Sequence, residues 1–158
     1  MSSDTVFEVI NEAKVNMDQI YDQPDPRAYF RELEKLGYTI PGVAKPIFQK
    51  LISHLRRRQN GSVHLLDLGC SYGINAALLK HDLSMPELYE HWGQEALLEA
   101  TPGEFVAQDR EFFDNLDEQE DISVTGLDQA ESAVAFALDA GLLDEGLAVN
   151  LETITDAR

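Results

Sequence analysis

The sequence predicts an α/β fold built on a parallel sheet. Short apolar segments bounded by turn residues recur at 62–68, 121–128 and 146–152, where they are typical of buried strands. Segments with the apolar spacing of helices follow the first two of them, at 74–81 and 129–141. Strands that alternate with helices indicate parallel strands joined by right-handed crossovers.

The chain before the first strand predicts a cap of helices over residues 1–60. Apolar residues recur at helical spacing over 5–20, and two prolines in "YDQPDPR" then interrupt the pattern. A second helix is expected over 26–37 and a third from about residue 43, ending at Asn60-Gly61. Residues 61–158 are expected to hold the sheet and its crossovers.

An acidic segment, residues 81–121, separates the first crossover helix from the second strand. It holds thirteen Asp or Glu and one Arg. Ser84 and Glu87, and again Thr101 and Glu104, have the spacing of a capping box, with a proline near each start. We therefore expect the segment to be a helical insertion.

Charge and composition narrow the function classes. The net charge is −17; residues 1–80 carry ten Lys or Arg against nine Asp or Glu, and residues 81–158 carry two against twenty. Such a surface repels phosphate backbones and anionic lipids, so we expect neither nucleic acid nor membrane binding. The single cysteine, Cys70, forms no metal-binding pattern, and the polar N-terminus does not resemble a signal peptide, so we expect a cytoplasmic protein without a metal.

The segment after the first strand can be read in two ways. Gly69–Gly73 spells G-x-S-x-G, the nucleophile elbow of serine hydrolases, in which Ser71 would attack. That elbow needs a later histidine, and only His81 and His91 follow, both within twenty residues. The hydrolase therefore remains the weaker alternative.

Read from Asp67, the same residues spell D-x-G-x-S-x-G, a cofactor loop with one glycine replaced. Small residues at Gly69, Ser71 and Gly73 allow a sharp turn and let a ligand approach the main chain. Asp67 could accept hydrogen bonds inside the loop. Asp128, at the end of the second strand, stands where a parallel nucleotide-binding fold places its ribose acceptor, although an N-cap of the next helix is the alternative.

"VHLLDLGCSYG" and "VTGLDQAESAVAFA" resemble motif I and the following acidic motif of class I S-adenosylmethionine-dependent methyltransferases. "GCSYGINAALL", with "YDQPDPRAYF" upstream, is similar to a group of bacterial methyltransferases of poorly defined substrate. The resemblance implies a Rossmann-like sheet with strand order 3-2-1 and S-adenosylmethionine as cofactor. A small molecule is the expected methyl acceptor.

The resemblance also implies roles for single residues. The loop from Gly69 to Gly73, with Cys70 and Ser71 inside it, would wrap the methionine part of the cofactor, and Asp67 would support the loop. Asp128 would hold the ribose hydroxyls and Gln129 would contact the adenosine. No residue of this chain is identified as catalytic.

The sequence departs from the family pattern in three respects. Ser71 replaces the middle glycine, and Asp67 and Asp128 are 128 − 67 = 61 residues apart, where about 20 is usual. The family sheet has seven strands and this chain supplies three, so we expect an incomplete fold that has no turnover alone. Its unpaired strand edge would favour self-association. A non-catalytic nucleotide-fold fragment that binds partners is the alternative function.

Other candidates are weaker. A dehydrogenase that binds NAD is disfavoured because G-x-G-x-x-G is absent. We interpret Cys70 as a compact filler rather than a nucleophile. Tyr21, Tyr29 and Trp92 could line a lid or a substrate site, but packing is the favoured interpretation for all three.

Overall fold

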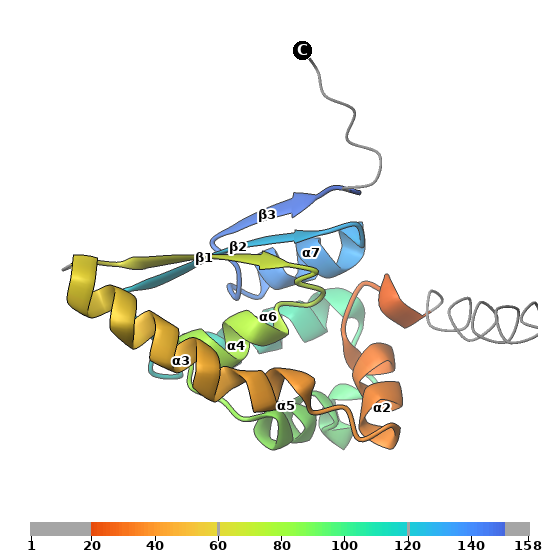
Figure 1. Ribbon diagram of the computed structural model, residues 1–158. Coiled ribbons are helices and arrows are strands. Elements are labelled where there is room, and N and C mark those ends of the chain that lie inside the picture. Colours follow the sequence, from red (N-terminus) through yellow and green to blue (C-terminus); the bar gives the residue numbers. More distant parts are fainter. Residues whose placement is uncertain (1–19, 60, 120, 151–158) are drawn as a thin grey trace, which may run out of the picture.

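The computed structural model of the chain describes residues 20–59, 61–119 and 121–150. These residues form a mixed α/β structure with three parallel strands, β1 (Val63–Leu68), β2 (Ile122–Asp128) and β3 (Glu145–Ala148) (Figure 1). The order β1-β2-β3 has the same neighbours as the expected 3-2-1, read from the other edge. The helix expected over 5–20 lies outside the described residues except for its last one.

The strand register brings the carboxyl ends of β1 and β2 together. Val63 pairs with Ile122 at one end of the β1–β2 ladder, and Leu68 pairs with Leu127 at the other. The loop that follows Leu68 therefore begins beside Asp128, although 57 residues separate Ser71 from that aspartate.

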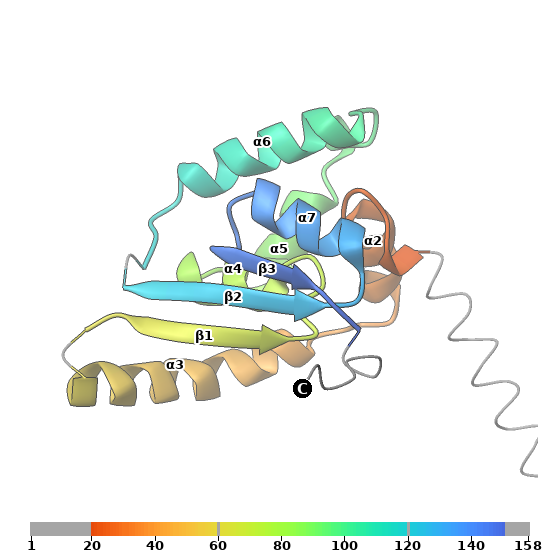
Figure 2. The same cartoon turned by 90° about the horizontal axis from the view of Figure 1, so that it is seen from above.

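Helices cover one face of the sheet in the described part of the chain. α4 (Ile74–Lys80) follows β1 and α7 (Glu131–Asp139) follows β2, and Figures 1 and 2 show both on the same side. Two right-handed crossovers that advance in the same direction place their helices on one face. α3 (Ile40–Gln59) lies on that side too, packed against α4 and β1.

The opposite face of the sheet is open among the described residues and carries exposed leucines beside a hydrogen-bonded polar cluster of His64, Ser123, Thr125 and Glu145. Leu66 and Leu68 of β1 are 60% and 61% exposed, and Leu147 of β3 is 51% exposed. Parallel sheets are usually covered on both faces. This open face is the clearest departure from an ordinary α/β domain.

The acidic segment 81–121 folds as expected into helices of its own. α5 (Met85–Trp92), a 3₁₀ turn (Glu95–Leu97) and α6 (Pro102–Asp114) follow one another. Both capping boxes form, because the Ser84 and Thr101 hydroxyls each accept from the main chain three residues on. Helices therefore occupy much of the 61-residue separation between the two aspartates.

One hydrophobic core joins the N-terminal helices, the insertion and the sheet. Phe30 of α2 (Arg27–Lys35) meets Trp92 of α5 edge-on, with ring centroids 4.2 Å apart, and Trp92 in turn contacts Phe136 of α7. Tyr72, in the loop after β1, packs against the same Phe136. None of the helices in residues 20–59, 61–119 and 121–150 is both long and apolar enough to cross a membrane.

Candidate cofactor site

The loop after β1 depends on three residues in the left-handed region. Gly69, Ser71 and Gly73 have φ angles of 77°, 48° and 80°. At Gly73 a Cβ atom would also lie only 3.1 Å from the Cβ atoms of Ala137 and Leu142, so a side chain there would require α7 and the turn after it to shift by a few tenths of an ångström. Ser71 adopts a conformation that glycine accepts at lower cost.

Main-chain hydrogen bonds fasten this loop onto the end of β2. The N–H groups of Gly69 and Cys70 donate to the Leu127 carbonyl at 2.8 and 3.3 Å, and Gly73 N–H donates to the Cys70 carbonyl at 2.9 Å. Ser71 N–H donates to Oδ2 of Asp128 at 2.9 Å. These four donors serve the protein itself, which distinguishes the loop from phosphate-binding loops, where such donors face the ligand.

Asp128 accepts hydrogen bonds from the glycine loop, from the turn before α7 and from Tyr21. The residue is only 5% exposed. Its Oδ1 accepts from Ala130 N–H at 3.0 Å, and its Oδ2 accepts from Ser71 N–H and from the Tyr21 hydroxyl, each at 2.9 Å. The N-cap interpretation of Asp128 is wrong, because Ala130 is the N-cap of α7 and has no side-chain cap; Asp128 instead fixes the turn before the helix through the Ala130 N–H. A carboxylate has about four acceptor positions, so one remains beyond these three bonds.

An open hollow of about 330 Å³ lies at the carboxyl end of the sheet. Its lining joins the ends of β1 and β2 to the chain after β3: Tyr21, Gly69, Leu127, Asp128, Gln129, Val149 and Asn150. A Cβ atom at Gly69 would meet nothing within 4 Å, so this glycine leaves its side of the hollow clear. Three predicted site residues, Gly69, Asp128 and Gln129, are thus brought to one hollow.

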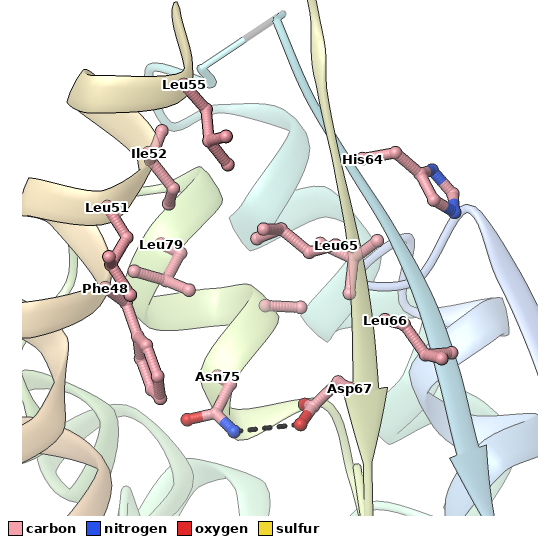
Figure 3. A pocket seen from close by; sticks show the side chains of 12 residues that line it. Phe48, Leu51, Ile52, Leu55, His64, Leu65, Leu66, Asp67, Asn75 and Leu79 are labelled. Carbon is pink, nitrogen blue, oxygen red and sulfur yellow. Dashed lines mark hydrogen bonds between the residues drawn. The ribbon is translucent and has the colours of Figure 1, made fainter.

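Asp67 does not line the hollow, and its side-chain hydrogen bond in the described residues goes to α4 rather than to the loop, where the sequence placed it. Its carboxylate accepts from the Asn75 side chain at 3.0 Å, which ties the end of β1 to the first turn of α4 (Figure 3). Burial raises the pKa of Asp67, and the Asp128 carboxylate adds to that rise. Asp67 and Asn75 also line a second, largely apolar cavity of about 250 Å³ between α3 and β1.

Cys70 occupies the space between the loop and β2. A Cβ atom on Gly126 would lie 2.7 Å from its sulfur, so the thiol fills the room that this glycine leaves. Burial, with the negative charges of Asp67 and Asp128, raises the pKa of Cys70 to about 12. A thiol that stays protonated at neutral pH is a poor nucleophile, which agrees with its interpretation as a filler.

Neither later histidine contacts Ser71 in the hydrogen bonds and ring contacts of the described residues. The His81 ring packs against Phe113, with centroids 5.2 Å apart, and Nε2 of His91 lies 2.5 Å from Oδ1 of Asp109. The Ser71 side chain is itself buried. A catalytic serine needs a base within hydrogen-bond reach, so this geometry gives no support to the hydrolase.

Tyr21 is the site residue whose role the sequence did not reveal. Tyr29 and Trp92 are buried in the core, as the packing interpretation predicts, but Tyr21 lines the hollow and donates to Asp128. No local pattern connects positions 107 residues apart. The proline turn that follows Tyr21 is the one signal that the chain changes direction there.

The loop and Asp128 meet at the hollow. Gly69, which has no side chain, lines it together with the buried Asp128 carboxylate. No protein-family model, curated protein or solved structure matches the chain, so these residues carry the functional argument by themselves.

Proposed function

We propose that the chain forms the cofactor-binding site of an S-adenosylmethionine-dependent methyltransferase that acts on a small molecule. One observation carries this proposal: the buried Asp128 carboxylate holds the glycine loop in place and also lines the hollow at the carboxyl ends of β1 and β2. In parallel α/β sheets, ligands bind at this end of the strands, and a carboxylate there accepts from ribose hydroxyls.

Charge favours a cationic nucleoside over a nucleotide with phosphates. The seven residues that line the hollow include the Asp128 carboxylate and no Lys or Arg. The N–H groups of Gly69, Cys70, Ser71 and Gly73 already have acceptors within the protein. A pyrophosphate would meet a negative charge without compensating donors, whereas a sulfonium would be attracted to it.

Each predicted residue has a place in this proposal. Gly69 leaves room for the methionine part, while Cys70, Ser71 and Gly73 shape the loop and Asp67 ties the end of β1 to α4. Asp128 accepts from the ribose hydroxyls, and Gln129, beside it in the lining, contacts the adenosine. Methyl transfer from a sulfonium is an in-line displacement in which proximity and orientation supply much of the rate, so these residues position the cofactor and the reaction requires no base from them.

Calorimetry with S-adenosylmethionine tests the proposal. Asp128→Ala should weaken binding by about tenfold to a hundredfold, because a buried ribose loses an acceptor worth roughly 1–3 kcal/mol. Asp128→Asn keeps the shape of the side chain and one acceptor oxygen, so it should disturb the fold less than Asp128→Ala and still bind more weakly than the wild type. Circular dichroism identifies a variant that has unfolded instead.

Asp121→Ala is the matched control. Asp121 lies just before the opposite end of β2, where its carboxylate pairs with Arg56 on α3, so this variant removes the same charge away from the hollow. Its affinity for the cofactor should equal that of the wild type. Equal binding by wild type, Asp128→Ala and Asp128→Asn would exclude Asp128 from the site.

The open sheet face favours a second candidate, a non-catalytic fragment that binds partners. Exposed Leu66, Leu68 and Leu147 and the apolar cavity between α3 and β1 form the kind of surface that a partner covers. The same calorimetry separates the two candidates. Absence of S-adenosylmethionine binding by the wild-type chain would favour the fragment.

A further inference from the structure

Tyr21 reaches across the hollow to the carboxylate that a nucleoside would use. Its hydroxyl donates to Oδ2 of Asp128 at 2.9 Å, and both residues line the hollow. The other donor to this oxygen, Ser71 N–H, belongs to the loop itself. Oδ1 keeps one acceptor position, but a ribose that places its two hydroxyls on both carboxylate oxygens must replace the Tyr21 phenol at Oδ2.

The main chain beside Tyr21 is held in place by the structure around it. The Tyr72 hydroxyl accepts from Gln23 N–H at 2.9 Å and donates to the Gln23 carbonyl at 3.0 Å. Oδ1 of Asp22 accepts from Ser132 N–H, in the first turn of α7, at 2.7 Å. With these anchors in place, the Tyr21 side chain can leave Asp128 while the main chain at 22–23 stays where it is.

The surroundings of Tyr21 suit a side chain that moves. The residue is half-buried, and its ring touches Tyr29 edge-on, with centroids 5.2 Å apart, rather than being enclosed in the core. Burial and the Asp128 carboxylate both raise the pKa of Tyr21, so the phenol keeps its proton and remains a donor throughout the neutral range. Its bond to Asp128 therefore competes with a ligand under all ordinary conditions.

We propose that Tyr21 is a gate for the cofactor site: its hydroxyl occupies the position on Asp128 that a ribose hydroxyl takes, and the ligand binds by exchanging one donor for the other. This inference rests on the proposed function, because it takes the ligand to be a nucleoside. It adds that in the free protein the Tyr21 hydroxyl competes with the ligand, and so weakens the binding of any ligand that uses Oδ2 of Asp128.

Binding of S-adenosylhomocysteine to Tyr21→Phe tests the gate. Removal of the phenol hydroxyl should tighten binding about tenfold, since a hydrogen bond to a charged acceptor no longer has to be broken. The 2′,3′-dideoxy derivative of the same ligand has no ribose hydroxyl to place on Asp128 and leaves the Tyr21 bond intact. Its affinity should therefore change less than about threefold between wild type and Tyr21→Phe.

Tyr89→Phe is the control for loss of a tyrosine hydroxyl. The Tyr89 hydroxyl donates to the Tyr38 carbonyl at 2.7 Å and does not line the hollow, so this variant should bind S-adenosylhomocysteine as the wild type does. Binding by Tyr21→Phe that is unchanged or weaker than wild type would overturn the gate and leave the proposed function standing. An equal gain for both ligands would also overturn the exchange, because it would show that Tyr21 only fills space. Failure of the wild type and of Tyr21→Phe to bind either S-adenosylmethionine or S-adenosylhomocysteine would overturn the proposed function and the gate with it.

Discussion

Ser71 combines an unfavourable main-chain conformation with a structural hydrogen bond. Its φ of 48° lies in the left-handed region, which costs an L-residue about 1–2 kcal/mol relative to the right-handed one. The N–H group of the same residue donates to the buried Asp128 carboxylate, and such a charge-assisted bond offsets the cost. The main chain of this position thus contributes directly to the site.

We predict that Ser71→Gly is at least as stable as the wild type. Relief of the left-handed strain should raise the free energy of unfolding, less the extra chain entropy of glycine, for a net gain of up to about 1 kcal/mol. Ser71→Ala keeps the strain and is the matched control in urea unfolding. A loss well above 1 kcal/mol in Ser71→Gly would show that the hydroxyl itself stabilises the loop.

A fluorophosphonate probe should not label the wild-type protein, and stoichiometric labelling at Ser71 would revive the hydrolase alternative.

The two helices of the insertion are joined by a buried polar cluster. Asp109 of α6 is 1% exposed, and its Oδ1 and Oδ2 accept from Trp92 Nε1 at 3.0 and 3.1 Å. His91 Nε2 lies 2.5 Å from the same Oδ1. The His91 ring also stacks on Phe112 at 3.6 Å. Burial raises the pKa of Asp109, while its bonds to His91 and Trp92 oppose that rise. The cluster fixes how α5 and α6 lie against each other.

Removal of the Asp109 carboxylate should therefore be costly. Asp109→Ala leaves the Trp92 N–H and the His91 ring buried without their acceptor, and we expect a loss of about 3 kcal/mol in the free energy of unfolding. Urea unfolding measures it. Asp114→Ala, which breaks the exposed Asp114–Arg110 pair on the same helix, should cost less than about 0.5 kcal/mol. Similar losses in both variants would mean that the buried cluster does not join the helices energetically.

The net charge and the exposed apolar surface have opposite effects on self-association of the molecule. The net charge of −17 repels a second copy, whereas the open face of the sheet, with Leu66, Leu68 and Leu147, attracts one. The free edge of β1 adds unpaired main-chain groups, because β1 pairs with β2 on one side in the described part of the chain. The balance between the two depends on ionic strength, since salt screens charge over about 10 Å at 0.1 M.

We predict that the chain self-associates increasingly as salt is added. Sedimentation at low and high salt measures this. Leu66→Lys places a charge on the open face and should keep the protein monomeric in both conditions, while Leu36→Lys makes the same change at an exposed leucine after α2, away from the sheet, and should associate as the wild type does. A wild-type monomer at every salt concentration would show that the open face does not drive association.

Local chemistry explains how much of the fold could be predicted. Both capping boxes and the first two strands lie where their residues indicate, because a cap or a buried strand depends on neighbours a few positions away. The third strand ends earlier than expected within the described residues: β3 spans Glu145–Ala148, whereas the apolar pattern predicts 146–152, of which 151–152 lie outside the described part of the chain. The end of a strand depends on where its pairing with the neighbouring strand stops. Here the last hydrogen bond between the two chain segments runs from Val149 N–H to the Asp128 carbonyl at the end of β2.

The sequence by itself determined the α/β class, the helices of the acidic segment and the meeting of the glycine loop with Asp128. That meeting follows from topology, because the carboxyl ends of adjacent parallel strands share one edge of the sheet. Only the tertiary structure decided that the leucine face is left open and that Tyr21 stands over the carboxylate. The position of Tyr21 depends on a chain path held by Tyr72 and by the first turn of α7, through hydrogen bonds between residues about 50 to 110 positions apart. No periodicity or spacing along the chain records such contacts, since they exist only once the core has formed.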